Sequence, residues 1–179
     1  MYAMIEGVLN YSTLSSSEQT IQKIDLNDTI KNIESDLEVL IQHKKGIIIK
    51  DTLPVIEGAS VLIYQLFYNL INNSFKFSKK DIPPTIIIRS SIVQHEGKDL
   101  AKITIADNGI GFDKEYTQHI FNAFARLNSK DKYEGTGLGL ALCKKIAERH
   151  HGSIQAESIK DQGATFILLL PLQQTTLTT

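Results

Sequence analysis

Several features that would place this chain of 179 residues in a specialised class are missing. It has one cysteine, which excludes an internal disulfide framework and a cysteine metal cluster. Its formal net charge of −1 gives no electrostatic reason to expect nucleic acid or an anionic membrane as a partner. No apolar run approaches the roughly 20 residues of a membrane span, and no signal peptide is evident. We therefore expect one domain of ordinary size that lies in the cytoplasm. This expectation is compatible with a parent protein that is anchored in a membrane.

Common catalytic motifs are absent as well. The chain has no G-x-x-x-x-G-K-[ST] phosphate loop, no dinucleotide fingerprint within a βαβ unit and no nucleophile elbow. His150 and His151 are adjacent, so on a helix they would point about 100° apart and make a poor metal pair. Cys143 lies in a helical pattern, which indicates a small packing residue.

Two glycine-rich stretches are the most informative feature that is present. The first is DNGIG at 107–111, and the second is GTGLGL at 135–140. Glycine lets the backbone turn with positive φ and lets a ligand approach bare N–H groups. The second stretch runs into a helical pattern, where unpaired N–H groups and the helix dipole favour an anion. Together they predict a nucleotide site, with one loop reading the base and the other cradling phosphates.

The mixture of antiparallel strand patterns and helical patterns predicts an α+β fold with a helix layer on one sheet face. Strands are expected at 21–26, 47–49, 85–93, 100–107, 153–158 and 164–170. Helices are expected after a cap at Asn27 or Asp28, after a cap at Ser60, and after Gly139, with a short one near 115–124. The apolar run at 47–49 predicts a buried strand.

Three parts follow one another along the chain. Residues 1–20 carry apolar positions at helical spacing and then a serine-rich stretch, which indicates the end of a longer amphipathic helix and a linker. Residues 21–172 form the main domain. The polar residues 173–179 are expected to be a frayed tail.

The expected helix at 60–77 is apolar nearly all round, which predicts burial. One line on its surface nevertheless carries polar side chains, namely Gln65, Asn69, Asn73 and Lys76. Buried polar groups need hydrogen-bond partners. An amide oxygen can bind a hard cation such as Mg²⁺, and a lysine can pair with phosphate. The alternative is that neighbouring loops cover this line.

Asp107 closes a strand in which Ile103 and Ile105 share its face, so alternation directs its carboxylate toward the apolar layer. A carboxylate there needs donors, and the amino group of adenine would be a suitable one. The alternative is a turn in which Asp-Asn-Gly supplies only loop chemistry.

The segment between the glycine stretches adds one candidate. Phe121 and Phe124 fit core anchors, whereas Arg126 is suited to clamp a terminal phosphate. The polar span 126–134 fits either a lid over the phosphates or a solvated loop.

In this order, the motifs resemble those of the catalytic, ATP-binding domain of sensor histidine kinases, of the Bergerat type shared with gyrase, Hsp90 and MutL. The resemblance covers about residues 22–172 and rests on five segments: 65–78, 107–112, 120–127, 133–152 and 162–171. It implies a two-layer α/β sandwich, the Bergerat fold, with a mixed sheet of about five strands covered on one face by about three helices. The short lid and the string at 133–152 look most like phytochrome-type and related hybrid sensor kinases.

The resemblance implies ATP and Mg²⁺ as cofactors and gives roles to the polar line. Asn73 would bind Mg²⁺ through its amide oxygen, and Asn69 would support the metal and the phosphates. Lys76 would touch the phosphates, and Phe77 would lie against the nucleotide. With Arg126 at the terminal phosphate, the implied catalytic residues are Asn69, Lys76 and Arg126.

It also gives roles to the loops. Asp107 would accept a hydrogen bond from the adenine amino group, and Gly109 and Gly111 would shape the base pocket. Thr165 would sit near Asp107 and the base. The implied phosphate cradle consists of Gly135, Thr136, Gly137, Leu138 and Gly139.

One departure concerns the phosphate acceptor. The family phosphorylates a histidine followed by an acid on the first of two dimerisation helices, and none of the five histidines here stands in that context. The resemblance therefore implies a protein histidine kinase domain that cannot autophosphorylate without acceptor helices outside this chain. Its implied partners are those helices and a response-regulator receiver domain of a two-component phosphorelay, in a homodimeric parent. Neither nucleic acid nor direct membrane contact by this segment is expected.

Two other functions stay open. The first is ATP hydrolysis, but gyrase and Hsp90 carry a glutamate base where this chain has Asn69, and an amide cannot take a proton. The second is a nucleotide-gated interaction module, in which a lid closes on ATP and changes a binding surface.

Overall fold

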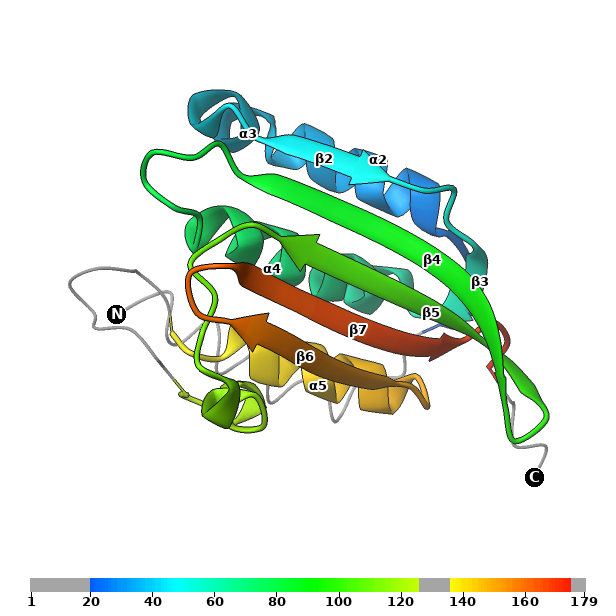
Figure 1. Ribbon diagram of the computed structural model, residues 1–179. Helices are drawn as coiled ribbons and strands as arrows, with labels where there is room; N and C mark the ends of the chain where they lie inside the picture. The colour runs from blue at the N-terminus through cyan, green and yellow to red at the C-terminus, as the bar shows by residue number, and fades with distance from the viewer. Residues whose placement is uncertain (1–19, 126–135, 175–179) are drawn as a thin grey trace.

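The computed structural model describes residues 20–125 and 136–174. Its centre is a five-stranded sheet in the order β2-β4-β5-β7-β6, with helices on one face (Figure 1). The strands are β2 (Ile47–Lys50), β4 (Thr85–His95), β5 (Lys98–Asp107), β6 (Ser153–Ile159) and β7 (Gly163–Pro171). Within this sheet β2 pairs parallel with β4, and the remaining pairs are antiparallel. The predicted α+β fold with a mixed sheet is therefore confirmed.

The helices form the second layer. They are α2 (Leu26–Asp36), α3 (Glu38–Lys44), α4 (Ser60–Lys76) and α5 (Gly139–Arg149), with short 3₁₀ turns at Lys114–Tyr116 and His119–Phe121. A small antiparallel sheet joins β1 (Gln22–Asp25) to β3 (Val55–Gly58). In the described part of the chain, no helix is both long enough and apolar enough to span a bilayer.

The core lies between the layers and is centred on α4. Leu66, Phe67, Leu70, Ile71 and Phe75 of this helix are fully buried. They pack with buried sheet residues such as Ile86, Ile88, Ile103, Ile105 and Leu168. Burying each such side chain contributes about 1.5–3 kcal/mol, so α4 is held firmly against the sheet.

Two predicted caps are wrong. Asp25, and not Asn27 or Asp28, caps α2, because its carboxylate accepts a hydrogen bond from the backbone N–H of Asn27 at 2.8 Å. The expected single helix is also divided at Leu37 into α2 and α3. Ser60 is the first residue of α4, and Ala59 takes the N-cap position without a side-chain cap.

The prediction that the strand at 47–49 is buried is also wrong. Ile47 is 54% and Ile49 53% exposed. The reason is topological, because β2 is the edge strand of the sheet and pairs only with β4. The strand β3 was not predicted, since four residues carry little periodic signal.

Candidate nucleotide-binding site

The Asp107 carboxylate lies half-buried at the end of β5 and accepts three hydrogen bonds. The N–H groups of Gly109 and Ala164 donate to its Oδ1 at 2.9 and 3.3 Å. The Ser74 hydroxyl of α4 donates to its Oδ2 at 3.1 Å. Burial raises the pKa of Asp107 above its ordinary value, and the three hydrogen bonds offset this only in part. The carboxylate is thus fixed in direction while its charge is poorly solvated.

The first glycine loop packs against the C-terminal end of α4. The N–H of Ile110 donates to the Phe77 carbonyl oxygen at 2.9 Å. A Cβ at Gly109 would lie 2.6 Å from that same oxygen, so only glycine lets the loop pass. Gly111 has φ +58°, and a Cβ there would lie 2.3 Å from the Ile159 carbonyl oxygen. The loop therefore occupies a narrow space between α4 and the β6–β7 hairpin.

The second glycine stretch meets α4 from the other side. The Asn73 side-chain nitrogen lies 4.0 Å from the position that a Cβ would take at Gly139, the first residue of α5. Gly137 has φ +74°, and its carbonyl oxygen accepts from the Phe124 N–H at 3.0 Å. No described side chain caps the first turn of α5, so its N–H groups suit an anion.

Within this turn, Thr136 and Leu138 have structural roles. The Thr136 hydroxyl accepts from the Leu138 N–H at 3.3 Å, and Leu138 is 3% exposed. Of the four predicted cradle residues that the structure describes, Gly139 is the one that lies beside Asn73.

Asn69 and Lys76 flank Asn73 on α4. The Asn69 side chain is hydrogen-bonded to Cys143 of α5, while the Cys143 thiol donates to the Leu66 carbonyl oxygen at 3.6 Å. Burial raises the pKa of this thiol to about 12, which fits the predicted packing role. The Lys76 ammonium lies 4.7 Å from the centroid of the Phe77 ring.

The structure does not bring the Thr165 side chain to Asp107. Thr165 is paired with Ala106, and side chains of neighbouring strand residues point to opposite faces. The Thr165 side chain therefore lies on the sheet face away from the Asp107 carboxylate. Its neighbour Ala164 makes the contact instead, through its backbone N–H. The expectation for Thr165 is corrected by this register.

Two predicted site residues, Arg126 and Gly135, lie outside the described residues, as do residues 1–19 and 175–179. The helix expected near 115–124 is replaced by the two 3₁₀ turns.

Two positioning groups were missed. Ser74 is 2% exposed, and a buried serine in an apolar helix was a usable signal. Lys44 at the end of α3 donates to the Phe75 carbonyl oxygen at 2.8 Å and to the Ser78 hydroxyl at 2.9 Å, fixing the end of α4. No local pattern could have shown that contact, because it joins residues 31 positions apart.

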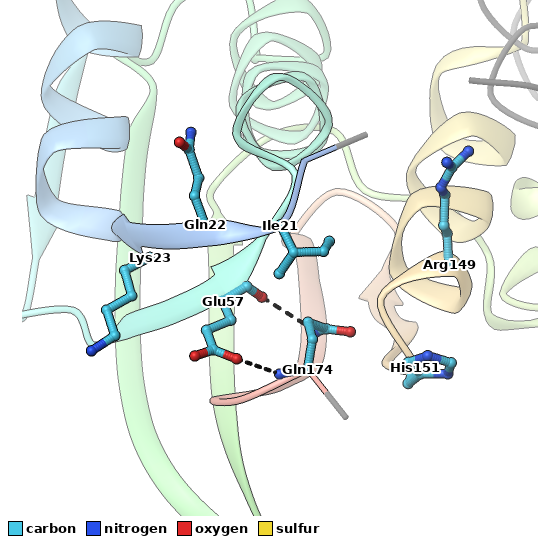
Figure 2. A pocket seen from close by; sticks show the side chains of 7 residues that line it. All are labelled: Ile21, Gln22, Lys23, Glu57, Arg149, His151 and Gln174. Atoms are coloured by element: carbon cyan, nitrogen blue, oxygen red, sulfur yellow. Dashed lines mark hydrogen bonds between the residues drawn. The ribbon is translucent and has the colours of Figure 1, made fainter. Parts of the chain in front are cut away.

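A cavity of about 430 Å³ lies elsewhere, between the small sheet, the end of α5 and the C-terminal segment (Figure 2). Its lining consists of Ile21, Gln22, Lys23, Glu57, Arg149, His151 and Gln174. None of the predicted site residues lines it, so it is separate from the arrangement of α4, α5 and Asp107.

A two-layer α+β domain with an acid-bearing glycine loop and an uncapped glycine-rich helix start defines the class of nucleotide-binding catalytic domains. A family model described as "Histidine kinase-, DNA gyrase B-, and HSP90-like ATPase" matches residues 58–174. This chain belongs to that family, and the prediction of an ATP-binding catalytic domain of the histidine kinase type is confirmed.

Similar proteins agree with this membership. The chain is 35% identical to "Cyanobacterial phytochrome A" of Nostoc sp. over 96% of its own length. It is 31% identical to "Phytochrome-like protein Cph1" of Synechocystis sp., also over 96% of its length. It spans 22% of the length of each of these relatives.

Two solved structures support the fold. The catalytic domain of histidine kinase ThkA has a TM-score of 0.72 at 23% identity, with 87% of this chain and 98% of that chain covered. Full-length ShkA in complex with AMPPNP has a TM-score of 0.78 at 21% identity, with 97% of this chain and 36% of that chain covered.

Proposed function

We propose that this domain binds ATP with Mg²⁺ and transfers the terminal phosphate to a histidine on a dimerisation helix of its parent sensor kinase. The observation that carries the proposal is the meeting of three elements. These elements are α4, α5 and the end of β5. The Asn73 amide of α4 faces the start of α5, and Ser74, near the end of α4, holds the Asp107 carboxylate of β5. A base at Asp107 and phosphates at Asn73 and Gly139 would be bound by one rigid frame.

The residues fit a magnesium ion that is held largely by the nucleotide. The described residues contain no group of three His, Cys, Asp or Glu side chains that could hold a metal. Mg²⁺ commonly keeps several waters and takes one or two protein ligands together with phosphate oxygens. Asn73 would supply that ligand, with Asn69 and Lys76 beside it, and the bound ion would neutralise charge on the phosphates.

The chemistry would consist of positioning and charge neutralisation. Asn69 stands one turn before Asn73 and is hydrogen-bonded to Cys143, and its amide cannot take a proton from water. This disfavours hydrolysis. Arg126 would approach the terminal phosphate from the segment after Phe124, where the resemblance places it. The first turn of α5 would hold the phosphates, with the acceptor histidine brought in by a separate helix.

The partners that we propose are suggested by the similarity to sensor kinases. Because the chain spans only part of them, the acceptor helices, a receiver domain and a homodimeric parent are proposals for the full-length protein. A cytoplasmic position of this domain is proposed on the same basis.

A transfer assay tests the proposal. The domain would be mixed with the dimerisation-helix fragment of its parent and with ATP labelled in the terminal phosphate. We expect label on the histidine, loss of that label in Asp107→Asn, and no loss in Asp99→Asn, which changes an exposed aspartate on the same strand. Release of free phosphate without labelled histidine would favour the hydrolytic alternative and overturn the kinase proposal.

A further inference from the structure

His150, directly after α5, is a buried histidine that the proposed chemistry does not use. Its side chain is buried, with the residue 2% exposed. The Ala59 N–H donates to its Nε2 at 3.0 Å, and its Nδ1 lies 2.8 Å from the Ile146 carbonyl oxygen. An amide N–H can only donate and a carbonyl can only accept, so the ring is neutral and carries its hydrogen on Nδ1.

The start of α4 is built to receive this imidazole. Ala59 is the N-cap and offers no side-chain cap, and the third residue of the helix is the apolar Leu62, so no capping box can satisfy the Ala59 N–H. A Cβ at Gly58 would lie 3.0 and 3.1 Å from His150 Cδ2 and Nε2. Glycine therefore leaves the room that the ring occupies.

This contact lies at one end of the interface between α4 and α5, which pack side by side (Figure 1). In the middle of the interface, the Cys143 thiol donates to the Leu66 carbonyl oxygen at 3.6 Å. The other end brings the Asn73 side chain to 4.0 Å from the Cβ position of Gly139. Asn73 follows Ala59 by 14 residues, which corresponds to about 20 Å along the helix. The His150 contact and the proposed phosphate site thus lie at opposite ends of one helix pair.

We propose that His150 is a positioning residue, whose neutral imidazole fixes the lengthwise register of α5 against α4 and so sets the spacing between Asn73 and Gly139. The inference rests on the proposed function in one respect, namely that phosphates bind between Asn73 and Gly139. Without the acceptor, the Ala59 N–H is buried and unpaired, which costs free energy. A shift of α5 that admits water to this N–H recovers part of that cost, and it moves Gly139 away from Asn73.

Protonation would break the same contact, because a hydrogen on Nε2 would face the Ala59 N–H. Burial lowers the pKa of His150, and the nearby Arg149 and His151 act in the same direction, against the hydrogen bond to Ile146. On the other sides, β3 contributes Glu57, the first turn of α4 contains no acidic residue, and Gln174 donates to the His150 backbone carbonyl. The hydrogen bond between the Ala59 N–H and His150 is therefore intact near neutral pH.

Three variants test this role. His150→Phe keeps a ring but cannot accept a hydrogen bond, whereas His150→Gln offers a non-titrating acceptor of similar reach. His151→Phe is the matched control, because His151 is the exposed neighbour. The dissociation constant of AMPPNP with MgCl₂ would be measured by calorimetry near neutral pH, at a temperature where circular dichroism shows every variant folded.

We expect His150→Phe to weaken binding about tenfold, the factor that an unpaired buried N–H can account for. His150→Gln and His151→Phe should bind within about twofold of the wild type. In the wild type the affinity should fall as the pH drops below 6.5 and through the lowered pKa of His150, and in His150→Gln it should change less. A lower Tm for His150→Phe with unchanged affinity would mean a structural role alone, and equal losses in His150→Gln and His150→Phe would overturn the role of the acceptor.

A second measurement does not need the nucleotide. The nuclear Overhauser effect between the Asn73 side-chain amide and the Gly139 α-protons reports their spacing directly. It should weaken in His150→Phe and persist in His151→Phe. An unchanged effect in His150→Phe would overturn the inference, whereas failure of the wild type to bind AMPPNP would count against the proposed function alone.

Discussion

Asp107, which we propose reads the base, is held in a position that disfavours its ionised form. Its carboxylate accepts from two backbone N–H groups and from Ser74, yet burial still raises its pKa. The folded protein therefore disfavours the ionised form. An acid with a raised folded pKa contributes stability below its unfolded pKa of 3.8, and that stability is lost as pH rises through the folded pKa.

The substitution Asp107→Asn separates the two effects. Its amide oxygen can accept the same N–H groups, and its NH₂ group can donate to Ser74, so we expect a Tm at neutral pH at least equal to that of the wild type. The NH₂ group would oppose the amino group of adenine, so AMPPNP affinity should fall at least about tenfold. Thermal melts and calorimetry check both statements, with the exposed Asp99→Asn as control. Unchanged affinity would contradict the base-reading role.

At the scale of elements, loop geometry was more predictable than packing partners. The glycine stretches, the helix that carries Asn73 and the strand that ends at Asp107 are local patterns, and the structure brings them together. The face of Thr165 was not predictable, because it depends on the register of β7 against β5. The acceptor for Ala59 comes from a residue 91 positions away, so no local signal at the start of α4 could reveal it.

Gly111 offers a test of how tightly the first glycine loop is packed. It has φ +58°, and an added Cβ would lie 2.3 Å from the Ile159 carbonyl oxygen. Gly97 in the β4–β5 turn has φ +74°, with nothing within 4 Å of the added atom. Gly111→Ala therefore combines strain with a backbone clash, whereas Gly97→Ala has the strain alone.

We expect Gly97→Ala to cost about 1–2 kcal/mol in the free energy of unfolding, the usual cost of a left-handed conformation. Gly111→Ala should cost more, about 3 kcal/mol or above, because the loop between α4 and the β6–β7 hairpin must move. Urea unfolding of the two variants measures the difference. Equal losses would mean that the loop has room that the structure does not indicate.

At the scale of the whole molecule, the buried His150 and the half-buried Asp107 lie at opposite ends of α4 and respond to pH in opposite senses. Burial lowers the pKa of His150 in the folded protein, so its contribution to stability is present above the unfolded value of 6.5 and is lost as pH falls through the folded pKa. Asp107 behaves in the reverse way, because its folded pKa is raised. The stability contributed at the start of α4 is therefore lost as pH falls, and the stability contributed at its end is lost as pH rises.

These opposite pH responses can be measured by comparing the free energy of unfolding of the wild type with that of each variant. The free energy of unfolding, followed in urea from about pH 8 to pH 5, should fall more steeply in the wild type than in His150→Gln, whose acceptor does not titrate. Over the same range, the stability advantage of Asp107→Asn over the wild type should stay constant or shrink toward acid, because protonation removes the charge that burial penalises. The exposed His151 should contribute little, so His151→Phe should follow the wild-type curve. Parallel curves for wild type and His150→Gln would show that the His150 ring stays neutral, or that its contact with Ala59 contributes nothing to folding.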